Sequence, residues 1–404
     1  MKRRQYLKGA GAAGIAGLLA GCSSNESDGG SGGQSDGASS DGGGSGGGDS
    51  GGDGGGDSDG GDGASSGSSG ESLETVGITS FPVNIPPLAY AEEEGIIEEE
   101  MSAAGYEYNV QWTFEGPALF ASGQTQIAFD VSTIEAARLA NQRDMNLTVA
   151  AKMMTDNIGM VLPADSEYAP SQTGGQQETL DKIVEDDARI GILGWSAGHI
   201  PIDQILMSEI WGKALQPEDG DFNVVEANPG ALPELMKEGE IVMAANSPAH
   251  GSGEELMSGE FVDLFYGSDE ISKRDLGIAP LINTVVTDEF MENHRPAVEA
   301  AVRAWNRGTD WFYESGVDDI PGNSTYMEQF GVEDPEVAEY ITKWHLTADY
   351  KDIPSAYETD TPIYHDDPYI DDEWLAMNEQ FMNNAVEVGQ APENWQDLVT
   401  YAKL

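Results

Sequence analysis

The chain has 404 residues, of which 72 are acidic and 19 basic, and its formal net charge is −53 at pH 7. This balance excludes nucleic acid as a partner, because no basic stripe is available to displace the counterions of a phosphate backbone. The single cysteine, Cys22, excludes an internal disulfide.

Residues 1–22 predict an export signal. Paired Arg3 and Arg4 precede a run of Ala, Gly, Leu and Ile that is too short to span a bilayer, which is typical of a twin-arginine signal. The run ends in Leu19-Ala20-Gly21-Cys22 and resembles the lipobox of secreted lipoproteins. We therefore expect Cys22 to be lipidated and to anchor the protein to the extracellular face of the membrane.

Residues 23–70 consist almost entirely of Gly, Ser and Asp, a composition that predicts a disordered tether. Four of the basic and nine of the acidic residues precede residue 71, so residues 71–404 carry 15 basic and 63 acidic residues and a net charge of −48. Such a body repels itself at low ionic strength. We expect a high-salt organism, in which an acidic surface maintains solubility. The body is too long for one core and suits two lobes.

From residue 75 to 162 the chain alternates between short apolar strands and helices. Val110, Trp112 and Phe114 alternate with polar residues and are expected on the buried side of one strand. The alternation predicts an α/β lobe with a mainly parallel sheet. The expected strands are 75–79, 108–114, 127–131, 147–153 and 158–162, and the expected helices are 88–101, 117–123 and 134–141.

A second α/β unit surrounds the stretch from Arg189 to Gly212. A buried strand is followed there by the turn Gly194-Trp195-Ser196-Ala197-Gly198 and then by a run with helical periodicity. The other expected elements of this unit are helices at 179–185 and 231–238 and strands at 222–226 and 241–245.

The remaining residues predict a strand at 278–287 and helices without further strands. A long amphipathic helix at 287–313 is expected to bury Phe290, Val298, Val302, Trp305 and Phe312, with Pro296 kinking it. Two more helices are expected at 334–345, capped by Asp334, and at 371–388. The expected division is residues 71–165 and 247–404 in the first lobe and residues 166–246 in the second.

Six segments carry a family resemblance: Val76–Thr79, Pro87–Ile96, Gly116–Leu119, Gly123–Asp130, Ala231–Ile241 and Val286–Phe290. Together they resemble the solute-binding proteins of ABC importers of the nitrate/sulfonate/taurine type, a family that includes thiamine-precursor binders. The resemblance implies an α/β, two-lobed, type II periplasmic-binding-protein-like fold with a ligand cleft between the lobes. It also implies delivery of a small solute to permease subunits in the membrane. We expect a monomer without a cofactor.

Two departures leave the solute open. Many members have Trp-Glu-Pro where this chain has Asn246-Ser247-Pro248, and their Asp-Leu-x-Gly-Lys turn is replaced by residues 183–188. The solute is therefore expected to be either nitrate/sulfonate/taurine-like or a pyrimidine of the thiamine-precursor kind.

Polar and aromatic residues follow the expected strands, where open α/β sheets bind ligands. Without a nearby Lys or Arg, these positions favour a monoanion, a zwitterion or a neutral heterocycle. No metal site is expected, because the histidines and carboxylates lack ligand spacing. The candidate ligand-binding residues are Ser80, Phe81, Gly116, Asp130, Ser132, Thr133, Trp195, Ser196, His199, Asn246, Ser247, His250 and Asn283.

The alternative interpretation is a secreted serine hydrolase. In it, Ser196 of the Gly-x-Ser-x-Gly turn is the nucleophile of a strained strand-to-helix elbow. An oxyanion loop should precede that nucleophile, yet the similar His250-Gly251-Ser252-Gly253 follows it. A two-lobed biosynthetic protein acting on a thiamine-type heterocycle is a third possibility, disfavoured by the export signal. We therefore prefer binding and assign no catalytic residue.

The charge predicts a dependence of folding on salt. At about 1 M salt the Debye length is roughly 3 Å and screens the mutual repulsion of the carboxylates. The circular dichroism of the purified protein should therefore show loss of structure when salt is lowered from molar to millimolar. A spectrum unchanged across that range would contradict this expectation.

Overall fold

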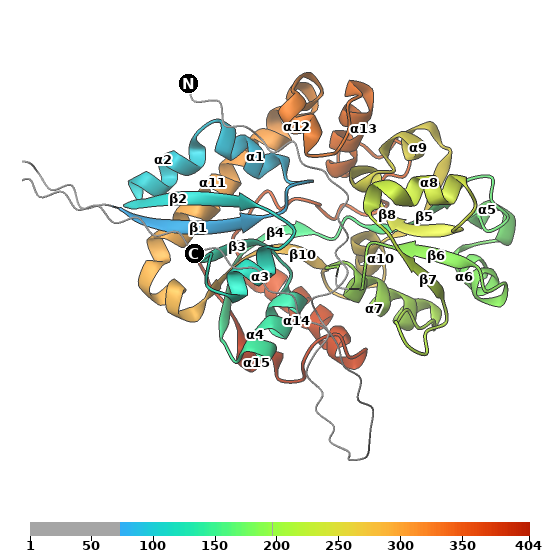
Figure 1. Ribbon diagram of the computed structural model, residues 1–404, viewed down its shortest axis with the longest axis horizontal. Helices are drawn as coiled ribbons and strands as arrows, with labels where there is room; N and C mark the ends of the chain where they lie inside the picture. Colours follow the sequence, from blue (N-terminus) through green and yellow to red (C-terminus); the bar gives the residue numbers. More distant parts are fainter. Residues whose placement is uncertain (1–72, 196) are drawn as a thin grey trace, which may run out of the picture. The chain divides into compact units, whose positions relative to one another are not determined.

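A six-stranded and a five-stranded sheet organise the computed structural model, which describes residues 73–195 and 197–404 (Figure 1). The export signal, Cys22, the tether and Ser196 lie outside the described residues. The first sheet has the order β11-β4-β10-β3-β1-β2, and all of its strands except β10 run parallel. These strands are β1 (Glu74–Ser80), β2 (Tyr106–Trp112), β3 (Ile127–Val131), β4 (Leu147–Thr155), β10 (Pro280–Thr287) and β11 (Val399–Tyr401).

The second sheet has the order β7-β6-β8-β5-β9, and here only β5 runs against the others. An α/β body was predicted from the sequence, with a mainly parallel sheet in the first lobe and a second α/β unit, and the α/β class is confirmed. The strands are β5 (Gly159–Pro163), β6 (Arg189–Ile192), β7 (Asn223–Glu226), β8 (Met243–Asn246) and β9 (Phe261–Tyr266).

The chain crosses twice between the sheets. Residues 156–158 join β4 to β5, and residues 267–279, which contain α10 (Gly267–Lys273), join β9 to β10. Pro280 pairs with Thr155 in the first sheet, and Gly159 pairs with Tyr266 in the second. The carboxyl ends of the parallel strands of both sheets therefore lie at the crossings. We call the ends of β1–β4 the first edge and the ends of β6–β9 the second edge.

Helices cover both faces of each sheet, in two groups of buried apolar side chains (Figure 1). Those packed in the first group are α1 (Pro86–Glu93), α2 (Ile96–Ala103), α8 (Leu232–Lys237), α9 (Gly253–Ser258), α11 (Asp288–Asp319), α12 (Ser324–Glu328) and α13 (Pro335–His345). Those packed mainly in the second are α3 (Gly116–Ala121), α4 (Thr133–Arg143), α6 (Gln176–Glu185), α7 (Ile200–Trp211), α10, α14 (Asp372–Glu387) and α15 (Trp395–Leu398), and the short α5 (Pro170–Thr173) adjoins α6.

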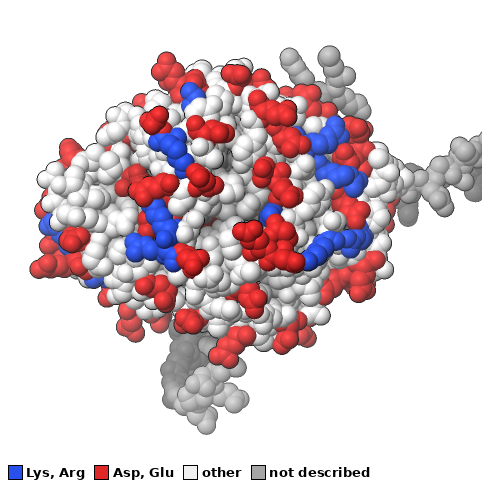
Figure 2. All heavy atoms as spheres, turned by 180° about the vertical axis from the view of Figure 1, so that it is seen from behind, with Lys and Arg blue, Asp and Glu red and all other residues white. Residues whose placement is uncertain are grey.

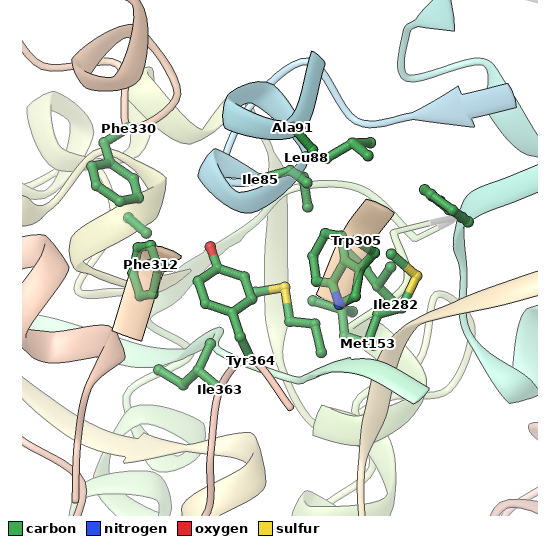
Figure 3. Close-up of a cluster of buried hydrophobic side chains, with 14 of the residues drawn as sticks. Ile85, Leu88, Ala91, Met153, Ile282, Trp305, Phe312, Phe330, Ile363 and Tyr364 are labelled. Carbon is green, nitrogen blue, oxygen red and sulfur yellow. The ribbon is translucent and has the colours of Figure 1, made fainter. Parts of the chain in front are cut away.

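The long helix α11 anchors the first lobe. Its five predicted core residues are all buried, and its backbone leaves helical geometry at His294, two residues before Pro296. Figure 3 shows Tyr364 between Phe312 and Trp305, with ring centroids 4.9 Å and 6.1 Å away. These edge-on aromatic contacts fix α11 against the segment that follows α13.

That segment, residues 346–371, forms a strap along the crossing. The Thr155 N–H donates to the Ile363 carbonyl, and the His365 N–H donates to the Met153 carbonyl, so the strap pairs with β4. On the other side, Tyr357 stacks on Tyr266 of β9 at 5.1 Å. The strap therefore contacts both sheets and adds a third physical link between them.

Four expectations need correction. Phe114 lies beyond the end of β2 and is 67% exposed, because the strand begins and ends two residues earlier than predicted. Residues 253–273 contain α9, β9 and α10, which were not predicted. The late helices are followed by a strand after all, β11. Finally, β5 and β9 pair in the second sheet, although their residues were expected in the first lobe.

Figure 2 shows acidic side chains spread over one whole face, with basic side chains scattered among them. Many of the basic groups are paired; Arg307, for example, contacts both Glu99 and Glu100. Within the part of the chain that the structure describes, no helix is long and apolar enough to cross a membrane.

Helix α11 approaches α1 so closely that only glycine fits at one position. A Cβ on Gly308 would lie 2.1 Å from the Pro87 carbonyl oxygen, a backbone atom that cannot rotate away. Gly308→Ala should therefore separate the two helices and lower the free energy of unfolding by about 1–3 kcal/mol. Urea unfolding in molar salt measures this. Gly322→Ala is the control, because no atom lies within 4 Å of its added Cβ. Equal stability of the two variants would contradict the close contact.

Candidate ligand site

The described candidate residues lie along the two edges. Ser80 ends β1, Gly116 opens α3 after β2, and Asp130 is the penultimate residue of β3. Asn283 of β10 is paired with Val131, so it reaches the same edge. On the other sheet, the candidates follow β6 and β8. The strand-end rule therefore places the predicted residues correctly, whereas their contact with a ligand stays a prediction.

Asp130 is a fully buried carboxyl group at the first edge. The Thr79 hydroxyl donates to its Oδ1 at 3.1 Å, but its Oδ2 has no hydrogen-bond partner. A Cβ on Gly116 would lie 1.5 Å from this Oδ2, so the carboxyl group needs glycine there. Burial raises the pKa of Asp130 to about 7 against the opposing Thr79 hydrogen bond, with a smaller contribution from the negative charge of Glu135. The Ser80 hydroxyl beside this strand end is also buried without a partner.

The start of α4 completes the first edge. The Glu135 N–H donates to the Ser132 hydroxyl at 3.1 Å, and the Ser132 N–H donates to the Glu135 carboxylate at 2.9 Å. This capping box commits both side chains to the helix end. The Asn283 amide lies 3.2 Å from the Thr133 hydroxyl. Ser132 therefore already has a structural role at the start of α4, and Thr133 and Asn283 contact each other.

At the second edge, β8 ends in a short polar turn. The Asn246 side chain donates to the Pro229 carbonyl at 3.2 Å and accepts from the Ser247 N–H at 2.7 Å. The Ser247 hydroxyl and His250 Nδ1 are 2.8 Å apart. Burial lowers the pKa of His250 to about 4, so its imidazole is neutral at pH 7. This turn offers uncharged hydrogen-bonding groups.

The loop after β6 carries the remaining candidates. The Trp195 N–H donates to Glu226 at 3.3 Å, and His199 precedes the first turn of α7 with its Nε2 buried and unpartnered. Burial lowers the pKa of His199 to about 3, with His250 as the second cause. A Cβ on Gly198 would lie 3.3 Å from the Glu135 carboxylate and 3.4 Å from Leu281. This loop therefore contacts the first lobe.

Two buried carboxyl groups near the crossing were missed by the sequence reasoning. Asp203, one turn after His199, is fully buried, and neither of its oxygens has a partner. Asp156 follows β4 directly, and its Oδ2 is also unpartnered. Burial raises the pKa of both groups well above the ordinary value, and the charge of Asp156 adds to the effect on Asp203. The strand-end rule applied to β4, and the i,i+4 spacing from His199, could have found them.

The arrangement favours holding a ligand over cleaving one. His250 Nδ1 already contacts Ser247, and His199 Nε2 lies 3.8 Å from Asp203, too far for a hydrogen bond. Helix α7 begins only at Ile200, so the helix does not start at the turn as a nucleophile elbow requires. Among the described residues, no three His, Cys, Asp or Glu side chains are grouped so that they could hold a metal ion.

Comparison with solved structures defines the class of fold. The alkanesulfonate-binding protein of Xanthomonas axonopodis pv. citri, solved with MOPS, matches 82% of this chain and all of its own at 12% identity and a TM-score of 0.56. The nitrate-binding protein of Synechocystis PCC 6803 matches 81% of this chain and 86% of its own at 11% identity and a TM-score of 0.57.

A Candida albicans protein described as having the generic periplasmic binding protein fold matches 83% of this chain and 98% of its own, at 12% identity and a TM-score of 0.53. The chain therefore has the two-lobed periplasmic-binding-protein fold, as predicted. No protein-family model matches the sequence, and no curated protein matches it either.

The raised pKa of Asp130 predicts how stability depends on pH. The Asp130 carboxyl group binds its proton more tightly in the folded chain than in the unfolded chain. At low pH, where both forms are protonated, Asp130 does not lower the free energy of unfolding. As pH rises from about 4 to about 7, it destabilises the fold increasingly. Asp130→Asn should therefore be close to wild type near pH 4.5 and more stable at pH 8 by up to about 4 kcal/mol.

Urea unfolding at fixed molar salt checks this, with Glu115→Gln as the control because Glu115 is an exposed acid on the same edge. A difference between Asp130→Asn and wild type that does not change between the two pH values would show that Asp130 is ionised normally in the fold.

Proposed function

We propose that this chain is the extracellular solute-binding component of an ABC importer. One observation carries the proposal. Buried polar atoms without hydrogen-bond partners occur on both edges, beside the two crossings between the lobes. Buried polar groups without partners are costly in a folded protein and rare. A polar solute held between the edges would supply the missing hydrogen bonds, and this function accounts for their retention.

The mechanism is lobe closure without covalent chemistry. The lobes would rotate about residues 156–158 and 267–279, which are the short crossings on which a hinge motion would act. Ligand contacts on both edges stabilise the closed form more than the open form, which is the only way in which a solute can shift this equilibrium. The closed form would then be the shape presented to the permease subunits.

The proposal includes the anchor and the setting. Cys22 would carry the lipid, the tether of residues 23–70 would hold the monomer away from the extracellular membrane face, and the acidic surface in Figure 2 suits a high-salt medium. The resemblance of the sequence leaves two classes of solute, either nitrate/sulfonate/taurine-like compounds or pyrimidines of the thiamine-precursor kind. The serine hydrolase alternative receives no support from the position of α7.

A thermal-shift screen in molar salt tests the function. One class of small solute should raise the melting temperature in a concentration-dependent way, corresponding to about 2.7 kcal/mol at one hundred times Kd. Ester substrates should not be turned over at all. If no solute stabilised the protein and an ester were hydrolysed by wild type but not by Ser196→Ala, the enzyme interpretation would replace the binding one.

A further inference from the structure

We infer that the solute held between the two edges is an organic cation, such as a protonated amine, and not an oxyanion. This inference rests on the proposed function and concerns the same site. It follows from the buried carboxyl groups of both edges, from the pairing of Arg138, Lys152 and Lys273 with other groups, and from aromatic rings on the first edge.

Carboxyl groups occur on both sides of the site. Asp130 and Glu135 belong to the first edge, and Asp156 and Asp203 lie at the crossing and behind the second edge. The loop after β6 lies between the two sets, because a Cβ on Gly198 would lie 3.3 Å from the Glu135 carboxylate and the next residue is His199. His199 Nε2 in turn lies 3.8 Å from Asp203 Oδ2. A single small solute between the edges would therefore be near carboxyl groups of both lobes.

Buried polar atoms without hydrogen-bond partners are a second observation, separate from the presence of acidic residues on both edges. His199 Nε2, Asn157 Oδ1 and Ser80 Oγ are buried without a hydrogen bond, as are one oxygen each of Asp130 and Asp156 and both oxygens of Asp203. Five of these seven atoms are carboxyl or amide oxygens, and all five are acceptors once the carboxyl groups are ionised. Acceptors without donors call for a ligand that donates hydrogen bonds, and an ammonium or amidinium group does so whereas a nitrate or sulfonate does not.

Three basic side chains on elements near the site, Arg138, Lys152 and Lys273, already have partners. Arg138 of α4 donates to the Gln390 carbonyl at 2.8 Å, Lys152 of β4 contacts Asp371 at 2.8 Å, and Lys273 of α10 contacts Asp269 at 2.8 Å. The imidazoles that face the site, His199, His250 and His345, are held neutral by burial. Among the described residues, these six groups would therefore offer an oxyanion little positive charge to offset the nearby carboxyl groups.

Aromatic rings complete the first edge. Phe114 is 67% exposed after β2, and its ring centroid lies 6.1 Å from that of Phe81 after β1. Trp195 lies half-buried on the loop that contacts the first lobe. Aromatic faces beside carboxyl groups are the usual surroundings of an organic cation in proteins. We therefore expect a cationic group on a carbon skeleton and not a bare inorganic ion.

The inference makes a prediction about protons. A cation favours the ionised carboxylate, so its binding near pH 7 should release protons from groups such as Asp130, whereas an oxyanion would require protonated carboxyls and should take protons up. Isothermal titration in two buffers with different ionisation enthalpies measures the sign directly. Matched probes share one carbon skeleton: benzylammonium, benzyl alcohol and benzenesulfonate, with choline, putrescine, taurine and nitrate added to the panel.

We expect saturable binding among the ammonium probes only, with proton release and with a lower affinity at pH 5 than at pH 7. Asp130→Asn should weaken that binding by roughly thirtyfold or more, because it removes one partner of a buried charge pair. Glu115→Gln, which removes an exposed charge from the same edge, should change it less than about threefold.

The outcomes separate this inference from the proposed function. Binding of benzenesulfonate, nitrate or benzyl alcohol in preference to every ammonium probe, or proton uptake on binding, overturns the assignment of charge and leaves the solute-binding function intact. Equal loss of affinity in Asp130→Asn and Glu115→Gln overturns the assignment of Asp130, because it would reflect only the general surface charge. Absence of saturable binding across the whole panel overturns the assignment of charge, and it overturns the proposed function as well when the thermal-shift screen also finds no stabilising solute.

Discussion

The two crossings between the sheets are the constraint on which the rest of the structure depends. Because β4 runs into β5 and β9 runs into β10 within a few residues or a short helix, the carboxyl ends of both sets of parallel strands meet at one place. Loops and helix starts that follow β1–β4 and β6–β9 are brought together there, although the candidate residues are spread from Ser80 to Asn283. A site at this position needs no special motif, since it follows from the direction of the strands.

The chemistry of the edges conflicts with stability. Asp130, Asp156 and Asp203 are buried where burial opposes their charge, and several of their oxygens have no partner. In a chain selected for stability alone, these positions would be apolar or paired, because unpartnered buried polar groups cost free energy. Retention of such groups on both lobes, next to the crossings, is expected where a ligand completes them.

Residue patterns in the sequence alone predicted a large part of the fold and of the positions of the candidate site residues. Strand ends such as Asn246 and helix caps such as Asp334 follow local rules, and the structure confirms both elements. The misses depend on tertiary structure. Strand β9 was overlooked, and the membership of β5 and β9 in the second sheet is decided by pairing with distant strands. The positions of Asp156 and Asp203 could have been found from the end of β4 and from the spacing to His199, but their burial comes from other elements.

The central claim is that one solute is held by both edges at once. Hydrogen–deuterium exchange in molar salt, with and without a stabilising solute, tests it most directly, because amide protection reports local opening along the whole chain. We expect the solute to slow exchange together at the first edge, around residues 80–81 and 130–133, and at the second edge, around residues 195–199 and 246–250. Protection confined to one edge, or placed away from both, would contradict binding between the lobes.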